Sequence, residues 1–232
     1  MPQTTPAPNG LEQFDGQLLD GLDFCIRAYE MLDELAGSSE GIEELRLLTT
    51  FRSKRLIEEI LPIASYVQSH HNLGVRLRVR WLSGNQPHDA YLLCSGGFVE
   101  HGTVPREQYL EVTTAVHPKY YLVREKVARD GFAFGPDDIH RDRKTGQIIS
   151  KAVAKDGTKA QAELVDIIVA RIIDKKSKQY PPETSLIVQC EAMLALPDEW
   201  VDIVGGVRSR IGGHSFREIF LYNAISARTA VL

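Results

Sequence analysis

The strictest pattern in the sequence is an alternation of apolar and basic residues over positions 75–81, and it limits what the chain can fold into. Apolar side chains occupy every second position, with arginines between them: Val75, Leu77, Val79 and Trp81 are apolar, and Arg76, Arg78 and Arg80 are basic. Successive side chains of a β-strand point to opposite faces of its sheet. The pattern therefore predicts a half-buried strand with one basic face.

Two further segments with strand character follow. Turn-forming residues at 83–87 end the first strand, and residues 88–94 (HDAYLLC) and 108–116 (QYLEVTTAV) are rich in residues that favour strands. A glycine-rich stretch containing a proline separates these two segments. Three strands in immediate succession predict an antiparallel meander.

Apolar residues at helical spacing mark the segments on either side of this meander. The expected helices cover residues 18–32, 51–67, 118–130, 161–179 and 197–211, so that two helices precede any strand. Short apolar strands are expected at 186–192 and, as the last element, at 216–222. This order predicts an α/β fold in which a mixed central β-sheet is flanked by helices.

Residues 132–160 are polar and rich in turn-forming residues. A structureless loop of this length is unusual inside a compact domain, so we interpret the segment as an insertion that contains a small hairpin around Thr145-Gly146. Residues 1–10 include three prolines and are interpreted as a disordered tail. The 232-residue length and 43% hydrophobic content then suit a single domain over residues 11–232.

Composition narrows the setting of the protein. The formal net charge of −4 excludes a global basic field, so any nucleic-acid contact must be local. No apolar run approaches the roughly 18 residues of a membrane span, and the first ten residues lack the features of a secretory leader, so we expect a cytoplasmic protein without membrane contact. Cys25, Cys94 and Cys190 lie in apolar segments and are expected to be reduced, buried thiols.

Two carboxylates occupy strand positions where an unpaired charge would be costly. Asp89 opens the second expected strand, and Glu111 lies inside the third between Leu110 and Val112. Neighbouring strands of a meander would bring the two carboxylates together on one face, which Thr113 shares with Glu111. Such a pair can hold Mg²⁺ and activate water against a phosphate. The alternative is a turn-capping Asp89 and a Glu111 paired with Arg78 or Arg80.

Over roughly residues 45–192 the chain resembles the PD-(D/E)XK, or restriction-endonuclease-like, nucleases. Pro87-His88-Asp89 matches the Pro-Asp element of that family, and Glu111-Val112-Thr113 matches its acidic-X-Lys triplet. The resemblance implies an αβββαβ core and a Mg²⁺- or Mn²⁺-dependent nuclease that hydrolyses phosphodiester bonds in DNA, in bacterial or phage defence or in DNA processing. It assigns the metal to Asp89 and Glu111.

The sequence departs from this family at two positions. His88 separates Pro87 from Asp89, and Thr113 stands where the family usually has the catalytic lysine. Lys175 and Lys178, near the end of the expected helix 161–179, are the most natural substitutes, and Arg124 and Lys126 are alternatives. All of these residues also suit solvated helix positions. If none replaces the lysine, the chain is a catalytically inactive nuclease-like fold that serves as a nucleic-acid-binding or protein-assembly module.

Basic residues elsewhere are candidate phosphate contacts. The candidates are Arg78 and Arg80 on the first strand, Arg124 and Lys126 on the third helix, and Arg141 and Arg143 in the charged cluster at 140–144. For that cluster a solvated hairpin is the equal alternative. Because the whole chain is slightly acidic, a homodimer or a partner subunit is expected to help bring the DNA. Glu58 and Glu59 are candidates for a third metal ligand or for surface residues. His70-His71 could ligate a metal, but no third spaced ligand accompanies them, so solvated or capping groups are expected.

Overall fold

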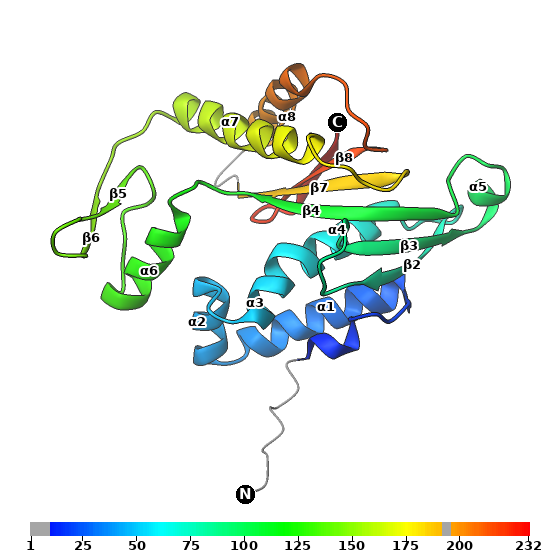
Figure 1. The fold of residues 1–232 in the computed structure, drawn as a ribbon, viewed down its shortest axis with the longest axis horizontal. Helices are drawn as coiled ribbons and strands as arrows, with labels where there is room; N and C mark the ends of the chain where they lie inside the picture. Colours follow the sequence, from blue (N-terminus) through cyan, green and yellow to red (C-terminus); the bar gives the residue numbers. More distant parts are fainter. Residues whose placement is uncertain (1–9, 192–195) are drawn as a thin grey trace, which may run out of the picture.

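The computed structural model describes residues 10–191 and 196–232, and a seven-stranded mixed sheet with helices on both faces organises them (Figure 1). This confirms the predicted α/β class. In spatial order the strands are β1 (Leu19–Asp20), β2 (Arg76–Trp81), β3 (Ala90–Ser95), β4 (Glu107–Ala115), β7 (Thr184–Cys190), β8 (Ile219–Asn223) and β9 (Arg228–Val231).

The helices divide into an N-terminal group and a group that follows the meander. The first group is η1 (Leu11–Gln13), α1 (Gly21–Ala36), α2 (Ser39–Leu47), α3 (Phe51–Arg55), the π-helical turn η2 (Leu56–Ile60) and α4 (Leu61–His70). The others are the short α5 (Gly97–Glu100), α6 (Tyr120–Asp130), α7 (Gly157–Lys176) and α8 (Pro197–Ile211). The three helices expected after position 110 are therefore present, as α6, α7 and α8.

The predicted meander is confirmed. Strands β2, β3 and β4 pair antiparallel in sequence order, with Trp81 opposite Ala90 and Ala90 opposite Leu110. The long connection after β4 returns the chain in the same direction, so β7 pairs parallel to β4, with Glu111 opposite Leu186. Parallel pairing needs such a crossover, and α7 supplies it.

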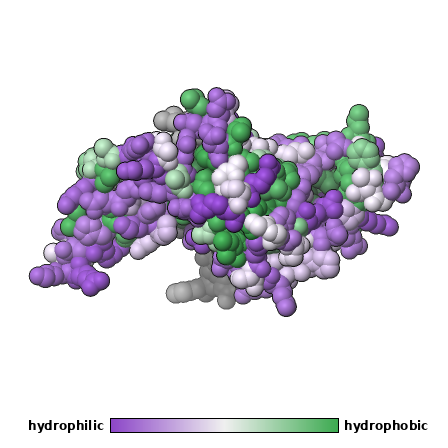
Figure 2. All heavy atoms as spheres, turned by 90° about the horizontal axis from the view of Figure 1, so that it is seen from above, coloured by the Kyte–Doolittle hydropathy of each residue, from purple (hydrophilic) through white to green (hydrophobic). Residues whose placement is uncertain are grey.

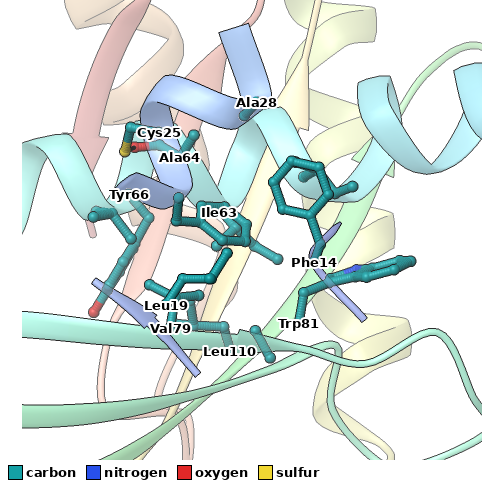
Figure 3. Packing of buried hydrophobic residues seen from close by; sticks show 14 of the residues in the cluster. Phe14, Leu19, Cys25, Ala28, Ile63, Ala64, Tyr66, Val79, Trp81 and Leu110 are labelled. Atoms are coloured by element: carbon teal, nitrogen blue, oxygen red, sulfur yellow. Dashed lines mark hydrogen bonds between the residues drawn. The ribbon is translucent and has the colours of Figure 1, made fainter. Parts of the chain in front are cut away.

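One face of the meander packs against the N-terminal helices. Leu77, Val79 and Trp81 of β2 are buried there, as the alternation predicted, while the arginines between them are exposed. Figure 3 shows how this core brings Phe14 and residues of α1 and α4 onto β2 and β4, with the Cys25 thiol directed at the carbonyl of Ala64. Burial of these apolar side chains is the main force holding the N-terminal helices to the sheet.

The other face is covered only over its second half. Helices α7 and α8 pack over β4, β7 and β8, where a second apolar cluster includes Ile168, Ile172 and Trp200. Every residue of β7 is buried, as expected for a central strand covered on both faces. On the same side of the sheet, the β2 arginines remain exposed.

The insertion contains the predicted hairpin. Strands β5 (Asp138–Arg141) and β6 (Ile148–Lys151) pair antiparallel, and Gly146 in the connecting turn has a φ of 72°, which favours glycine. Leu122, Ile139 and Ile148 form a small separate core between α6 and the hairpin. This end of the molecule projects beyond the sheet and is mainly hydrophilic (Figures 1 and 2).

Several sequence expectations need correction. The two-residue β1 precedes α1, and α2 lies between the two expected N-terminal helices; Ser38 accepts a hydrogen bond from Gly41 N and so caps α2. Helix α7 begins at Gly157, not 161, because the Asp156 side chain caps it. Strand β8 is not the last element, since β9 pairs with it; the short R-T-A-V alternation gave too weak a signal.

The remaining expectations concern termini, thiols and membranes. The expected tail, apart from Gly10, lies outside the described residues, as does Ala192 at the end of the expected strand 186–192. Cys25, Cys94 and Cys190 are buried and form no disulfide, as predicted. Among the helices that the structure describes, none has the length and apolar character needed to cross a bilayer.

Candidate active site

The meander brings Asp89 and Glu111 together. Asp89 directly precedes β3, whose first residue Ala90 pairs with Leu110, and the Asp89 amide donates to Leu110 O at 2.8 Å, so that Asp89 lies beside Glu111. The amide of Val112 donates to Asp89 Oδ2 at 2.7 Å, which ties the carboxylate across to β4. Glu111 is only 8% exposed although it is charged. Asp89 thus contacts β4, and does not cap its own turn as the alternative proposed.

Lys175 reaches this pair from α7. Its Nζ donates to Glu111 Oε1 at 2.5 Å, and both side chains are mostly buried. Helix α7 lies over β4 with its C-terminal end above Glu111, so a lysine in the last turn can point down to the sheet. Glu111 is therefore paired with Lys175, and the alternative pairing with Arg78 or Arg80 is wrong.

Tyr180 is a member of the cluster that sequence reasoning missed. Its hydroxyl donates to Glu111 Oε1 at 3.4 Å from the segment that joins α7 to β7. Burial, and next the charge and hydrogen bond of Glu111, raise the pKa of this tyrosine, so that its hydroxyl stays protonated as a donor. The only signal was an aromatic residue just before Pro181-Pro182, which on its own indicates a turn.

Asp89 is electrostatically strained. Burial and then the charge of Glu111 raise its pKa from 3.8 to about 6, against the opposing effects of the Val112 amide, Lys175 and Arg55. Two neighbouring carboxylates disfavour each other's ionisation, and a cation between them would relieve that repulsion. The arrangement is therefore one in which added positive charge stabilises the folded protein.

Polar side chains surround Asp89 and Glu111, and not all of their buried polar atoms form hydrogen bonds. His88 Nδ1 is buried and meets no hydrogen-bond partner among residues 10–191 and 196–232, and burial lowers the pKa of this histidine. Arg55 forms an ion pair with Glu59, and Glu59 Oε2 also accepts from Trp81 Nε1 at 3.0 Å. Glu58 lies 3.8 Å from Arg124. Both glutamates therefore contact other residues and do not join Asp89 and Glu111.

The chemistry of this donor set suits a hard cation held by two protein carboxylates. Within the described residues no group of three or more histidine, cysteine or acidic side chains converges on one point. Mg²⁺ commonly uses one or two carboxylates and completes its octahedron with water and substrate phosphate, so Asp89 and Glu111 fit it. Thr113 follows on β4, on the same side of the sheet as Glu111, and is partly buried beside Val188.

The other predicted lysines and arginines do not reach the pair. Lys178 is half-exposed and lies 3.2 Å from Asp174. Lys126 donates to Asp130 and to the carbonyl of Ile148, which places it inside the insertion. Of the candidates for the missing lysine, only Lys175 contacts Glu111 in the described structure.

The expected phosphate contacts separate into two groups. Arg124, Lys126, Arg141 and Arg143 belong to α6 and the β5–β6 hairpin, at the opposite end of α7 from Lys175 (Figure 1). Arg141 pairs there with Glu125 at 2.5 Å, which favours the solvated-hairpin alternative. Arg78 and Arg80, in contrast, lie on the same face of the sheet as Glu111, two strands away.

A second polar cluster was also missed. The Tyr66 hydroxyl donates to Glu218 Oε1 at 2.5 Å, and its oxygen lies 3.3 Å from Ser185 Oγ. His70 Nε2 lies 3.0 Å from the same Glu218 oxygen. The His70 ring stacks on Tyr66. The expectation that His70 is solvated is therefore wrong, because it takes part in a partly buried network that joins α4 to the start of β8. The capping alternative fits in part, since His70 Nδ1 lies 2.9 Å from the carbonyl oxygen of Tyr66 in the last turn of α4.

Comparison with known proteins gives no match: no family model, no curated protein and no solved structure is significantly similar to this chain.

Proposed function

We propose that this chain is a metal-dependent phosphodiesterase of the PD-(D/E)XK type that cleaves DNA. The observation that carries the proposal is the Asp89–Glu111 pair with Lys175 Nζ on the Glu111 carboxylate. The order of elements around this pair, three antiparallel strands followed by a helical crossover to a parallel strand, supports the resemblance noted in the sequence. Lys175 from α7 would take the place of the family's catalytic lysine, which is absent at position 113.

In this proposal the carboxylates of Asp89 and Glu111 hold Mg²⁺ or Mn²⁺, which when bound activates water and neutralises charge on a phosphate. Lys175 orients the attacking water and stabilises the negative charge that develops on the phosphate oxygens. Val112 N fixes Asp89, and the Tyr180 hydroxyl fixes Glu111, so that both carboxylates are held in position before substrate arrives. Arg78 and Arg80 would hold phosphates further along the strand.

A second candidate function is a binding module without catalysis. Lys175 already neutralises Glu111 in the structure, so a structural ion pair accounts for the same contact. Under this alternative, divalent metal leaves stability unchanged and DNA stays intact. The two candidates therefore differ in their response to metal.

The test is cleavage of plasmid and of circular single-stranded DNA by wild type, Asp89→Asn, Glu111→Gln and Lys175→Met, each with Mg²⁺, Mn²⁺ or EDTA. Loss of a positioned acid, base or charge costs about 10²–10⁴-fold in rate. We expect metal-dependent cleavage by wild type and a loss of at least a hundredfold in each variant. Lys178→Met is the matched control, because this lysine lies one turn away and pairs with Asp174; it should cleave normally.

Two results would contradict the enzymatic proposal. A folded wild-type protein that leaves both DNA forms intact with either metal would favour the binding module. Cleavage by Lys175→Met at the wild-type rate would remove the role given to Lys175, even if the carboxylate variants are inactive.

A further inference from the structure

The sheet face beside the acidic pair is open to solvent over β2, β3 and the first half of β4. On this side α7 and α8 cover β4, β7 and β8, whereas α1 and α4 lie on the other side of β2 (Figure 1). Arg76, Arg78 and Arg80 are exposed along β2, and Tyr91 and Leu93 of β3 are partly exposed. A ligand can therefore reach this surface without any rearrangement of the described elements.

Aromatic rings form a continuous strip across this face. The ring centroids of His88 and Tyr109 lie 4.8 Å apart, and those of Tyr109 and Tyr91 lie 5.8 Å apart. The guanidinium carbon of Arg80 lies 5.9 Å from the centre of the Tyr91 ring. Because Arg80 pairs with Tyr91 and Tyr91 with Tyr109 in the sheet register, the strip runs across the strands. We call these four residues the aromatic strip.

The strip begins beside the acidic pair. Tyr109 and Glu111 lie two residues apart on β4, so their side chains share one face of the sheet, and Tyr91 pairs with Tyr109 on that face. Two residues along a strand span about 6.7 Å. His88 is the immediate neighbour of Asp89 and continues the strip toward it. A polymer bound along the strip would therefore reach the acidic pair within about one of its repeating units.

The chemistry of this face selects a polymer that offers both negative charge and flat rings. The three β2 arginines attract phosphates, and the strip offers rings on which bases can stack. A duplex hides the faces of its bases and presents phosphates alone, whereas a single strand exposes both. Glu107 is hydrogen-bonded to Tyr91 and lies at the edge of the strip away from Asp89. If two copies of the protein paired through this face, the β2 arginines of one copy would lie against those of the other and repel them.

We propose that this open face binds single-stranded nucleic acid, with bases stacked on Tyr91 and Tyr109 and phosphates held by Arg78 and Arg80. The inference deepens the proposed function, on which it rests for the placing of a phosphate at Asp89 and Glu111. It makes the substrate a single strand and not a duplex.

The experiment is fluorescence anisotropy of a labelled 15-nucleotide DNA strand, the same sequence as RNA, and the DNA duplex, all in EDTA so that binding is measured without cleavage. We expect at least one single strand to bind about tenfold or more tightly than the duplex. Loss of a stacked base costs on the order of tenfold in affinity. The double variant Tyr91→Ala/Tyr109→Ala should therefore bind the strand at least tenfold more weakly, with duplex binding unchanged.

Matched variants separate stacking from charge and from misfolding. Tyr121→Ala removes an exposed tyrosine of α6, which lies outside the strip, and should bind as wild type does. Arg80→Ala should weaken both strand and duplex, because it removes a phosphate contact. If the alanine double variant does not fold, Tyr91→Leu/Tyr109→Leu keeps apolar contacts on the sheet while removing the rings, and it should show the same loss.

Equal affinity for strand and duplex, binding that the tyrosine variants leave unchanged, or no binding of any nucleic acid would overturn this inference. Metal-dependent cleavage that Asp89→Asn abolishes, without a single-strand preference, would overturn the inference alone. Single-strand binding through the strip in a protein that cleaves nothing would overturn the proposed catalysis and leave the strip as a binding surface.

Discussion

Asp89 and Glu218 are both largely buried carboxylates, yet the protein surrounds them in opposite ways. Glu218 accepts hydrogen bonds from Tyr66 and His70; burial alone would raise its pKa, but these donors outweigh burial and lower it. Asp89 receives one backbone amide, faces Glu111 and has a pKa raised to about 6. The first carboxylate therefore stabilises the fold at neutral pH, and the second destabilises it.

This difference separates a structural network from a candidate site. A carboxylate that accepts a full set of hydrogen bonds stabilises the folded protein, so its placement needs no functional explanation. A carboxylate held against a second one lowers stability, and such unfavourable placements concentrate where function requires them. The comparison therefore favours the proposed role in binding or catalysis for Asp89 and Glu111, and a structural role for the Tyr66–His70–Glu218 network.

The largest expected effect on stability is that of Glu218→Ala. The change leaves the Tyr66 hydroxyl and the His70 ring without their shared acceptor, and we expect a loss of about 2–4 kcal/mol in the free energy of unfolding. Urea unfolding at pH 6 measures it. Glu183→Ala removes an exposed partner of Arg217 and should cost less than about 0.5 kcal/mol. If Glu218→Ala and Glu183→Ala both lost less than about 0.5 kcal/mol in the free energy of unfolding, the structural role given to Glu218 would be wrong.

Asp89→Asn should have the opposite sign. Because the folded-state pKa of Asp89 is raised from 3.8 to about 6, its ionisation costs no stability below pH 3.8, and the cost grows as pH rises and is complete above pH 6. We expect the variant to be more stable than wild type by about 1–3 kcal/mol at pH 8 in EDTA, and equal to it near pH 4. Urea unfolding at both pH values tests this, with Asp166→Asn as the exposed control. A variant less stable than wild type at pH 8 would contradict the assignment.

The smallest expected effect concerns His70. Burial lowers the pKa of this histidine, but the hydrogen bond and charge of Glu218 outweigh burial and raise it above 6.5. Its contribution is therefore complete below pH 6.5 and is lost as pH rises through the raised value. His70→Gln should cost more at pH 5.5 than at pH 9, by less than about 1 kcal/mol. A cost that is the same at both pH values would show that His70 is neutral in the fold.

The parts of the fold that the sequence predicted depend on local periodicity. The alternation around Arg78 indicated both the β2 strand and its exposed face, and three such segments in succession indicated the meander. Given the meander, the positions of Asp89 at the start of one expected strand and of Glu111 inside the next were enough to predict that they lie close together. Lys175 was predicted from its position near the end of a helix that returns over the sheet.

What the sequence did not predict depends on distant contacts or on local competition. Tyr66 and Glu218 are 152 positions apart, and no periodicity links them. Tyr180 directly precedes Pro181-Pro182, and this pattern predicts a turn but gives no indication of the contact with Glu111. Lys126 and Arg141 were expected to bind phosphates, but acidic neighbours in the insertion, Asp130 and Glu125, pair with them. Strand β9 was missed because four edge residues give little pattern.

The central claim is that Asp89 and Glu111 together bind a divalent cation, and isothermal titration calorimetry with Mn²⁺ at pH 7.5 tests it most directly. Wild type should give saturable binding, Asp89→Asn and Glu111→Gln should give none, and Glu183→Gln should match wild type. The absence of binding heat with wild type, or unchanged binding in Asp89→Asn, would contradict the claim.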